Sequence, residues 1–259
     1  MLFIPIETPI IRADDDIVEV FLDSIRRCGE KLVDGDILVV ADKVVAVSEG
    51  RTVYLEEVEP SSEAIKLSKK HALNPQYVEL ILREADEVYG GVEKAILTLK
   101  KGVLIANAGI DHTNVPIGHV SLWSQDPNKK AVDIRNEVQR RTGVNVGVLL
   151  VDSRVHPLRM GTTAFALGVA GLEPIQDLRG KKDLYGKTLY ITRINVADDL
   201  AAASHLLMSE ADEGRPLIIV RETPVKVTDE YNAEEVKIPK DQCLYFRSFR
   251  CKLKNMSRD

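Results

Sequence analysis

The 259-residue sequence has few cysteines, no excess of positive charge and no long apolar segment. Its three cysteines form no CxxC pair, which excludes a zinc ribbon or a disulfide framework and fits a reducing cytoplasm. A formal net charge of -5 argues against a general nucleic-acid binder. No apolar run approaches the roughly 20 residues that span a bilayer, and the start MLFIPIETPII lacks the basic segment of a signal peptide. We therefore expect a cytoplasmic protein with neither nucleic acid nor a membrane as a partner.

The remaining composition is that of an ordinary globular protein, with 44% hydrophobic and 29% charged residues. This length is sufficient to bury a sizeable core, as one large domain or two small ones. No stretch has the composition of a linker, so we expect two interleaved lobes within residues 1–245, followed by a basic, loosely ordered tail at 246–259.

Hydrophobic periodicity predicts an α+β fold of mixed sheets with packed helices. Strands are expected at residues 3–6, 37–40, 103–105, 148–151, 189–191 and 217–220. A helix from residue 17 to 32 is expected to end at Gly35, and Asn74-Pro75 and Asp126-Pro127 have the sequence of helix starts. The helix before Asn74 and the helix after it are expected to pack as a hairpin. A further helix is capped by Asn195 or Asp198.

The stretch VGVLLVDSRVHPLRMG, residues 146–161, contains the strongest chemical signal. An apolar strand ends abruptly at Asp152 and Ser153, before a segment broken by Pro157 and Gly161. A carboxylate and a hydroxyl at the edge of a sheet are typical of hard-cation and phosphate sites. Taken alone, the pattern favours the simpler interpretation that Asp152 caps a turn, so other parts of the chain must decide.

A second polar stretch, ANAGIDHTNVP, follows the strand at 103–105. Gly109 permits a tight turn directly before Asp111, and Asp111 with Asn114 offers two oxygen groups three residues apart. The neighbouring His112 has the pattern of a surface histidine. In residues 41–51 a β-branched run ends in a turn, and Lys43, on a loop, is either a phosphate contact or simply solvated.

The segment GKKDLYGKT, residues 180–188, is close to a phosphate-binding loop but has five residues rather than four between its glycines. The residues after it read as a strand instead of a helix. A turn before a strand is therefore the better interpretation.

The order of several motifs resembles the coenzyme F420-0:L-glutamate ligase family over roughly residues 4–222. These motifs are DGDILVVADKVVAVSEGR, ANAGIDHTNVP, QDPNKKAVDIR, VDSRVHPLRMG, AGLEPIQDLRGKKDLYG and SEADEGRP. The resemblance implies a GTP-dependent amide ligase. It would transfer the γ-phosphate to a carboxylate of F420-0, and the amine of L-glutamate would then displace the phosphate. It also implies Mn²⁺ or Mg²⁺, assistance from K⁺, and an intertwined homodimer.

The resemblance also implies a set of site residues. Asp111, Asp152, Ser153 and Glu210 would hold the metal, and Asp152 and Arg159 would be catalytic. Nucleotide contacts are expected at Pro9, Ile10, Ile11, Arg12, Ala41, Asp42, Lys43, Asn114, Met208, Ser209, Glu210, Ala211, Asp212, Glu213, Gly214 and Arg215. Oxygen ligands suit hard cations that neutralise a triphosphate, and an acyl phosphate requires a site that excludes water.

Three positions depart from the family pattern. Val47 stands where a lysine is usual, Val155-His156-Pro157 replaces a Gly-Arg-Pro, and Ser153 replaces a threonine. Each lost basic contact is worth on the order of 1.5 to 3 kcal/mol. The departures leave open the same chemistry on another acceptor, such as a folate or pterin, or a nucleotide-binding homologue without activity.

Overall fold

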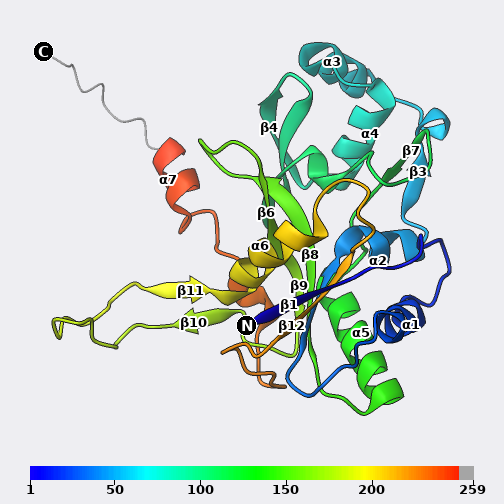
Figure 1. Cartoon of the computed structure of the whole chain (residues 1–259). Helices are drawn as coiled ribbons and strands as arrows, with labels where there is room; N and C mark the ends of the chain where they lie inside the picture. Colours follow the sequence, from blue (N-terminus) through cyan, green and yellow to red (C-terminus); the bar gives the residue numbers. More distant parts are fainter. Residues whose placement is uncertain (251–259) are drawn as a thin grey trace, which may run out of the picture.

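The structure is a computed structural model that describes residues 1–250. It is a mixed α+β protein whose central element is a five-stranded sheet with the strand order β1-β12-β2-β8-β9 (Figure 1). Its strands are β1 (Leu2–Ile6), β12 (Leu217–Arg221), β2 (Ile37–Ala41), β8 (Gly147–Val155) and β9 (Thr162–Ala170). The pairing of β2 with β8 is parallel, and the other three pairings are antiparallel.

Helices cover both faces of this sheet. Helices α1 (Ile17–Arg27) and α5 (Pro127–Thr142) lie on one face, and α6 (Val196–Met208) lies on the other (Figure 1). The alternation along β2 explains this arrangement, since Leu38 and Val40 join the core under α1 and α5, while Ile37 and Val39 join the core under α6. A strand buried on both sides reads as a continuous apolar run, as the sequence does at this point.

A separate hydrophobic core, away from the two on the faces of the main sheet, lies beneath the helix pair α3 (Ser62–His71) and α4 (Pro75–Glu84). It includes Tyr77, Ile81, Ile96 and Ile110. The neighbouring strands are β3 (Thr52–Tyr54) and β7 (His119–Ser121), which pair with each other, and β4 (Glu87–Val92), β5 (Ala95–Lys100) and β6 (Val103–Ala106), which form a three-stranded sheet. The predicted packing of the two helices is confirmed.

Short elements complete the chain. Helix α2 spans Asp42–Ser48, and the 3-10 turns are η1 (Leu55–Glu57), η2 (Asn107–Gly109) and η3 (Ala233–Val236). Strands β10 (Ile175–Asp177) and β11 (Arg193–Asn195) form an arm that projects from the body of the molecule (Figure 1). No helix within residues 1–250 is long and apolar enough to cross a membrane.

The predicted helix starts are confirmed in detail. Asp126 caps α5 by accepting a hydrogen bond from the Lys129 N–H, and Asn74 caps α4 in the same way. Asn195, rather than Asp198, caps α6. Gly143 ends α5 in a left-handed conformation with φ 74°.

Four expectations about local structure are wrong. Helix α1 ends at Arg27, not near Gly35, because Gly29 adopts a left-handed backbone with φ 75°. Residues 42–48 form α2 rather than an extended run, since Val45 and Ala46 turn inward together and burial outweighs β propensity. Residues 189–191 are not a strand, because Tyr190 and Ile191 are exposed and have no buried face.

The fourth wrong expectation is that the chain is loosely ordered directly from residue 246. Its residues 246–250 belong to helix α7 (Leu244–Arg250), and the Phe246 ring packs edge-on against Tyr89 of β4. Residues 251–259 of the predicted tail lie outside the described residues. The turn expected in residues 180–188 is confirmed, since Gly186 donates its N–H to Asp183 O at 3.0 Å, but the strand expected directly after it is absent and β11 begins only at Arg193.

Candidate functional site

Asp152 lies where β8 loses one of its two neighbours. The parallel pairing with β2 ends at Ala41 and Val151, and β8 continues paired with β9 alone, with Asp152 opposite Phe165. The expectation that Asp152 follows the end of its strand is therefore wrong, because the β8–β9 hairpin outlasts the sheet. Asp152 nevertheless lies directly beyond the last residue of β8 that pairs with β2.

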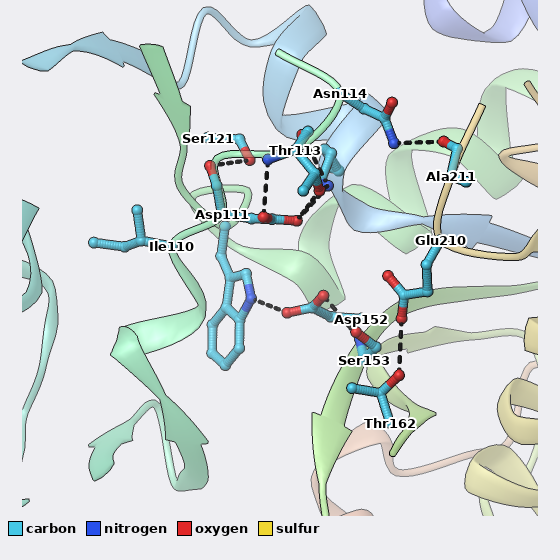
Figure 2. Close-up of polar contacts among 12 residues, drawn as sticks. Ile110, Asp111, Thr113, Asn114, Ser121, Asp152, Ser153, Thr162, Glu210 and Ala211 are labelled. Carbon is cyan, nitrogen blue, oxygen red and sulfur yellow. Dashed lines mark hydrogen bonds and ion pairs between the residues drawn. The ribbon is translucent and has the colours of Figure 1, made fainter. Parts of the chain in front are cut away.

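The carboxylate of Asp152 is partly buried and held by two donors. The indole N–H of Trp123 donates to Oδ2 at 2.6 Å, and the backbone N–H of Ser153 donates to Oδ1 at 2.8 Å (Figure 2). Burial raises the pKa of Asp152 to about 7, with a further contribution from the Asp42 carboxylate, although both hydrogen bonds and Lys43 lower it. The group therefore titrates near neutral pH.

Asp42, at the start of α2, is a second buried carboxylate. It is 1% exposed, and both of its oxygens accept hydrogen bonds from Ser124, one from the backbone N–H and one from the hydroxyl. Burial raises the pKa of Asp42 to about 6, although the Ser124 donors lower it. Asp42 was predicted to contact the nucleotide, but its side chain points into the protein and binds Ser124.

Asp111 follows the η2 turn, and its carboxylate accepts hydrogen bonds from Lys43 and Thr113. Its backbone pairs with Ser121 of β7. Oδ2 accepts from Lys43 Nζ at 2.5 Å and from the Thr113 hydroxyl at 2.7 Å, and Oδ1 accepts from the Thr113 N–H (Figure 2). Burial acts to raise the pKa of Asp111, but Lys43 and Thr113 outweigh it and hold the pKa below its ordinary value. Lys43 lies in the first turn of α2, not on a loop.

Three loops from distant parts of the chain meet around these carboxylates. The N–H of Thr8, between β1 and α1, donates to Gly214 O at 3.0 Å. The amide of Asn114, with φ 54°, donates to Ala211 O at 2.9 Å (Figure 2). We call residues 7–16, 112–118 and 209–215 the rim loops. They contain most of the residues predicted to contact the nucleotide.

Glu210 lies in the third rim loop, directly after Ser209, which ends α6 with φ 61°. Its Oε1 accepts from the Thr162 hydroxyl at 3.2 Å (Figure 2). The same oxygen contacts His205 Nε2 at 2.8 Å. Thr162 pairs with Val155 on the β8–β9 hairpin, three residues beyond Asp152. Glu210 therefore contacts the hairpin at a position three residues beyond Asp152, apart from the other candidate metal ligands.

Of the predicted arginines, Arg12 and Arg159 are exposed and Arg215 is half-buried. Arg159 lies on the tip of the β8–β9 hairpin, and within residues 1–250 its side chain makes no hydrogen bond or ion pair. Arg12 uses its backbone N–H to bind Asp15 at 2.7 Å. Arg215 contacts Glu7 at 3.4 Å, between the first and third rim loops.

The donor set fits a hard divalent cation that is bound mainly by phosphates. In the part of the chain that the structure describes, no three His, Cys, Asp or Glu side chains come together as a metal cage. Mg²⁺ is ordinarily bound by one or two carboxylates together with substrate phosphates and water, which Asp111 and Asp152 match. Mn²⁺ accepts the same oxygen ligands.

Comparisons with known proteins identify the family of the chain. The family model described as F420-0:Gamma-glutamyl ligase matches residues 5–222. The chain belongs to the F420-0:Gamma-glutamyl ligase family. It is 41% identical over 217 residues to the Coenzyme F420:L-glutamate ligase of Methanothermobacter thermautotrophicus, covering 83% of this chain and 86% of that protein. It is 37% identical over 219 residues to the protein of the same name from Methanopyrus kandleri, covering 84% of each.

A third relative matches a larger share of the chain. The Coenzyme F420:L-glutamate ligase of Archaeoglobus fulgidus is 35% identical over 233 residues, covering 90% of this chain and 91% of that protein. The matched range of the F420-0:Gamma-glutamyl ligase family contains all three rim loops as well as Asp152. The predicted family membership is confirmed.

The sequence analysis missed several residues that hold the candidate ligands. Trp123 binds Asp152, Thr113 binds Asp111, and His205 binds Glu210. Thr113 could have been found, because a hydroxyl two residues after an aspartate often forms such a local turn. The contacts of Trp123 and His205 depend on tertiary structure and leave no local pattern.

Proposed function

We propose that this protein is a GTP-dependent ligase that adds L-glutamate to coenzyme F420-0. The observation that carries the proposal is the pairing of the Lys43 ammonium with the Asp111 carboxylate beside Asp152, under loops that belong to the matched family range. A cation and two carboxylates at one sheet edge provide opposite charges for a metal-bound triphosphate. The names of the relatives support the acceptor and the amino acid.

In the proposed reaction, a carboxylate oxygen of F420-0 attacks the γ-phosphorus of GTP and GDP leaves. The amine of glutamate then attacks the resulting acyl phosphate, the amide forms, and phosphate leaves while the amine loses a proton. A divalent cation, Mn²⁺ or Mg²⁺, would neutralise charge on the phosphates. Asp111 and Asp152 would hold that cation, with Ser153 and Glu210 as further oxygen groups.

The other residues have separate proposed roles. Lys43 would move from Asp111 to the phosphates when the cation arrives, because both the cation and the ammonium compete for that carboxylate. The rim loops would contact the nucleotide and restrict water around the acyl phosphate. Arg159, free at the hairpin tip, would bind a carboxylate or phosphate of a substrate. Assistance from K⁺ stays a prediction.

The test is GDP formation from GTP with MnCl₂ and glutamate, with and without F420-0, followed by mass spectrometry of the acceptor. We expect GDP release that depends on F420-0 and a product heavier by one glutamyl group or more. Release that depends on a folate or pterin instead would change the acceptor. GTP binding without turnover on any acceptor would refute the ligase assignment.

The Asp152→Ala variant tests the site within that assay. We expect it to lose turnover while it still folds and unfolds cooperatively, because the carboxylate serves the cation and not the core. Asp133→Ala is the matched control, since Asp133 lies on the exposed face of α5. Full activity of Asp152→Ala would remove Asp152 from the mechanism.

We also propose that the protein is a homodimer in which the β10–β11 arm contacts a second copy. Support comes from the apolar side chains that the arm exposes, Leu184, Tyr185, Tyr190 and Ile191. Isolated apolar residues are common on surfaces, but a projecting arm that carries four is typical of an interaction site. Sedimentation equilibrium should give a dimer that dissociates in the Leu184→Ser, Ile191→Ser double variant. A monomeric wild type would contradict the proposal.

A further inference from the structure

The single tryptophan of the chain stands between Asp152 and a buried charge cluster that the proposed reaction does not use. Trp123 is 2% exposed, and its indole N–H donates to Asp152 Oδ2 at 2.6 Å. It follows β7 in the segment whose next residue, Ser124, binds Asp42. Two adjacent residues thus hold the carboxylates of Asp152 and Asp42.

The orientation of Trp123 is fixed from several directions. Arg51 Nε donates to the Trp123 carbonyl oxygen at 2.5 Å, and Lys100 Nζ lies 4.9 Å from the ring centroid. Gly109 permits the closest contact, since a Cβ at that position would lie 2.3 Å from atoms of the indole ring. The ring therefore has no room to turn away from Asp152.

Behind the ring lies a buried cluster of charged side chains, and removing these charges from water costs free energy. Lys100 is 2% exposed and pairs with Glu84 at 2.7 Å, and Arg51 reaches the same carboxylate at 3.2 Å. A buried ion pair adds little stability compared with apolar side chains of the same size. Its geometric effect is clear, because Lys100 and Arg51 both bind Trp123 directly.

The effect on Asp152 follows from its two hydrogen bonds. With Oδ2 held by the indole and Oδ1 held by the Ser153 N–H, the carboxylate has one orientation, and each oxygen keeps a lone pair for another partner. Groups that hydrogen-bond to a metal ligand set its direction, and their removal weakens metal binding by about 10- to 100-fold.

We propose that Trp123 is the positioning residue for Asp152, and that Lys100 beside the ring and Arg51 on the main-chain carbonyl hold Trp123 in place for this purpose. The inference rests on the proposed function only for the role of Asp152. The contact itself is independent of metal, nucleotide and acceptor.

The first test uses the ligand-free protein. Because the chain has one tryptophan, a ¹H–¹⁵N correlation spectrum contains one indole N–H signal, and a hydrogen bond to a carboxylate shifts its proton downfield. We expect Asp152→Asn to move that signal upfield and the surface variant Asp133→Asn to leave it unchanged. If the chemical shift of the indole N–H proton is the same in Asp152→Asn as in the wild type, the proposal is overturned.

The second test measures metal binding. Trp123→Phe keeps an aromatic ring but removes the N–H donor, and we expect it to bind Mn²⁺ about 10- to 100-fold more weakly by electron paramagnetic resonance. Tyr245→Phe, which changes an exposed ring outside the proposed site and the proposed dimer contact, should bind as the wild type does. Wild-type Mn²⁺ affinity in a folded Trp123→Phe protein would refute the positioning role.

The two tests separate this inference from the proposed function. If the wild type binds no Mn²⁺ but Asp152→Asn still moves the indole signal, the metal assignment fails and the positioning contact stands. If Mn²⁺ binds and the signal does not move, Trp123 is not the positioning residue. Should Trp123→Phe not fold, the spectrum of Asp152→Asn decides alone.

Discussion

Replacing Asp152 by asparagine is expected to stabilise the ligand-free protein at pH 8. Burial raises the pKa of Asp152 to about 7 in the folded protein. In the unfolded chain the pKa returns to about 3.9, and each difference of 1 corresponds to about 1.4 kcal/mol. The ionised carboxylate therefore lowers the free energy of unfolding by about 4 kcal/mol at pH 8.

Asparagine removes that charge at a smaller cost. The two carboxylate oxygens accept from Trp123 and Ser153, whereas an amide has one acceptor oxygen, so one hydrogen bond is lost. Such a loss costs about 1 to 3 kcal/mol. The net gain is then about 2 kcal/mol, or about 4 to 8 °C in the unfolding midpoint for a chain of this size.

The pH dependence gives the sign of the effect. As the pH falls through 7, folded wild type takes up a proton at Asp152 while the unfolded chain stays ionised, so wild-type stability recovers until the pH reaches about 4. The asparagine variant has no such change, and its advantage should vanish near pH 5. Urea unfolding at pH 5 to 8 without metal measures this, with Asp133→Asn as control. An asparagine variant that is less stable than wild type at pH 8, or a difference independent of pH, would refute the reasoning.

Three further perturbations have definite expected outcomes. Lys43→Met should raise KM for GTP by about 10- to 100-fold, since a charge-assisted contact is lost, and an unchanged KM in steady-state kinetics would exclude the phosphate role. Gly109→Ala should lower the free energy of unfolding by about 1 to 3 kcal/mol in urea, because the added Cβ meets Trp123 and φ is 68°. Asp36→Asn should cost about 3 to 5 kcal/mol, because it leaves the Arg221 guanidinium without its bidentate partner, and a melting temperature close to that of wild type would contradict this.

The local signals in the sequence predicted the elements that depend on local chemistry. The caps at Asn74 and Asp126 need only a side-chain acceptor and a following proline, so both helix starts were predicted correctly. The apolar runs of β2, β8 and β12 were also predicted, because a strand buried on both faces has a continuous apolar sequence. Helix α2 was missed, since its β-branched residues become helical only through burial.

The candidate site was predicted by residue but not by geometry. Asp111 and Asp152 were singled out by their places after apolar strands. The ion pair between Lys43 and Asp111 joins residues 68 apart, and the bond from Trp123 to Asp152 joins residues 29 apart. Neither leaves a periodic pattern, because tertiary folding alone brings the partners together. The hairpin of β4 and β5 was missed as well.

The rim loops and the carboxylates beneath them differ in how easily they separate. The hydrogen bonds from Thr8 to Gly214 and from Asn114 to Ala211 tie the rim together. At about 0.5 to 1.5 kcal/mol each, their loss would leave roughly one to fifteen per cent of molecules with an open rim at any moment. Asp111 and Asp152 are each fixed by neighbours within the folded body and do not move with the rim. The two carboxylates therefore keep their positions whether the hydrogen bonds between the rim loops are formed or broken.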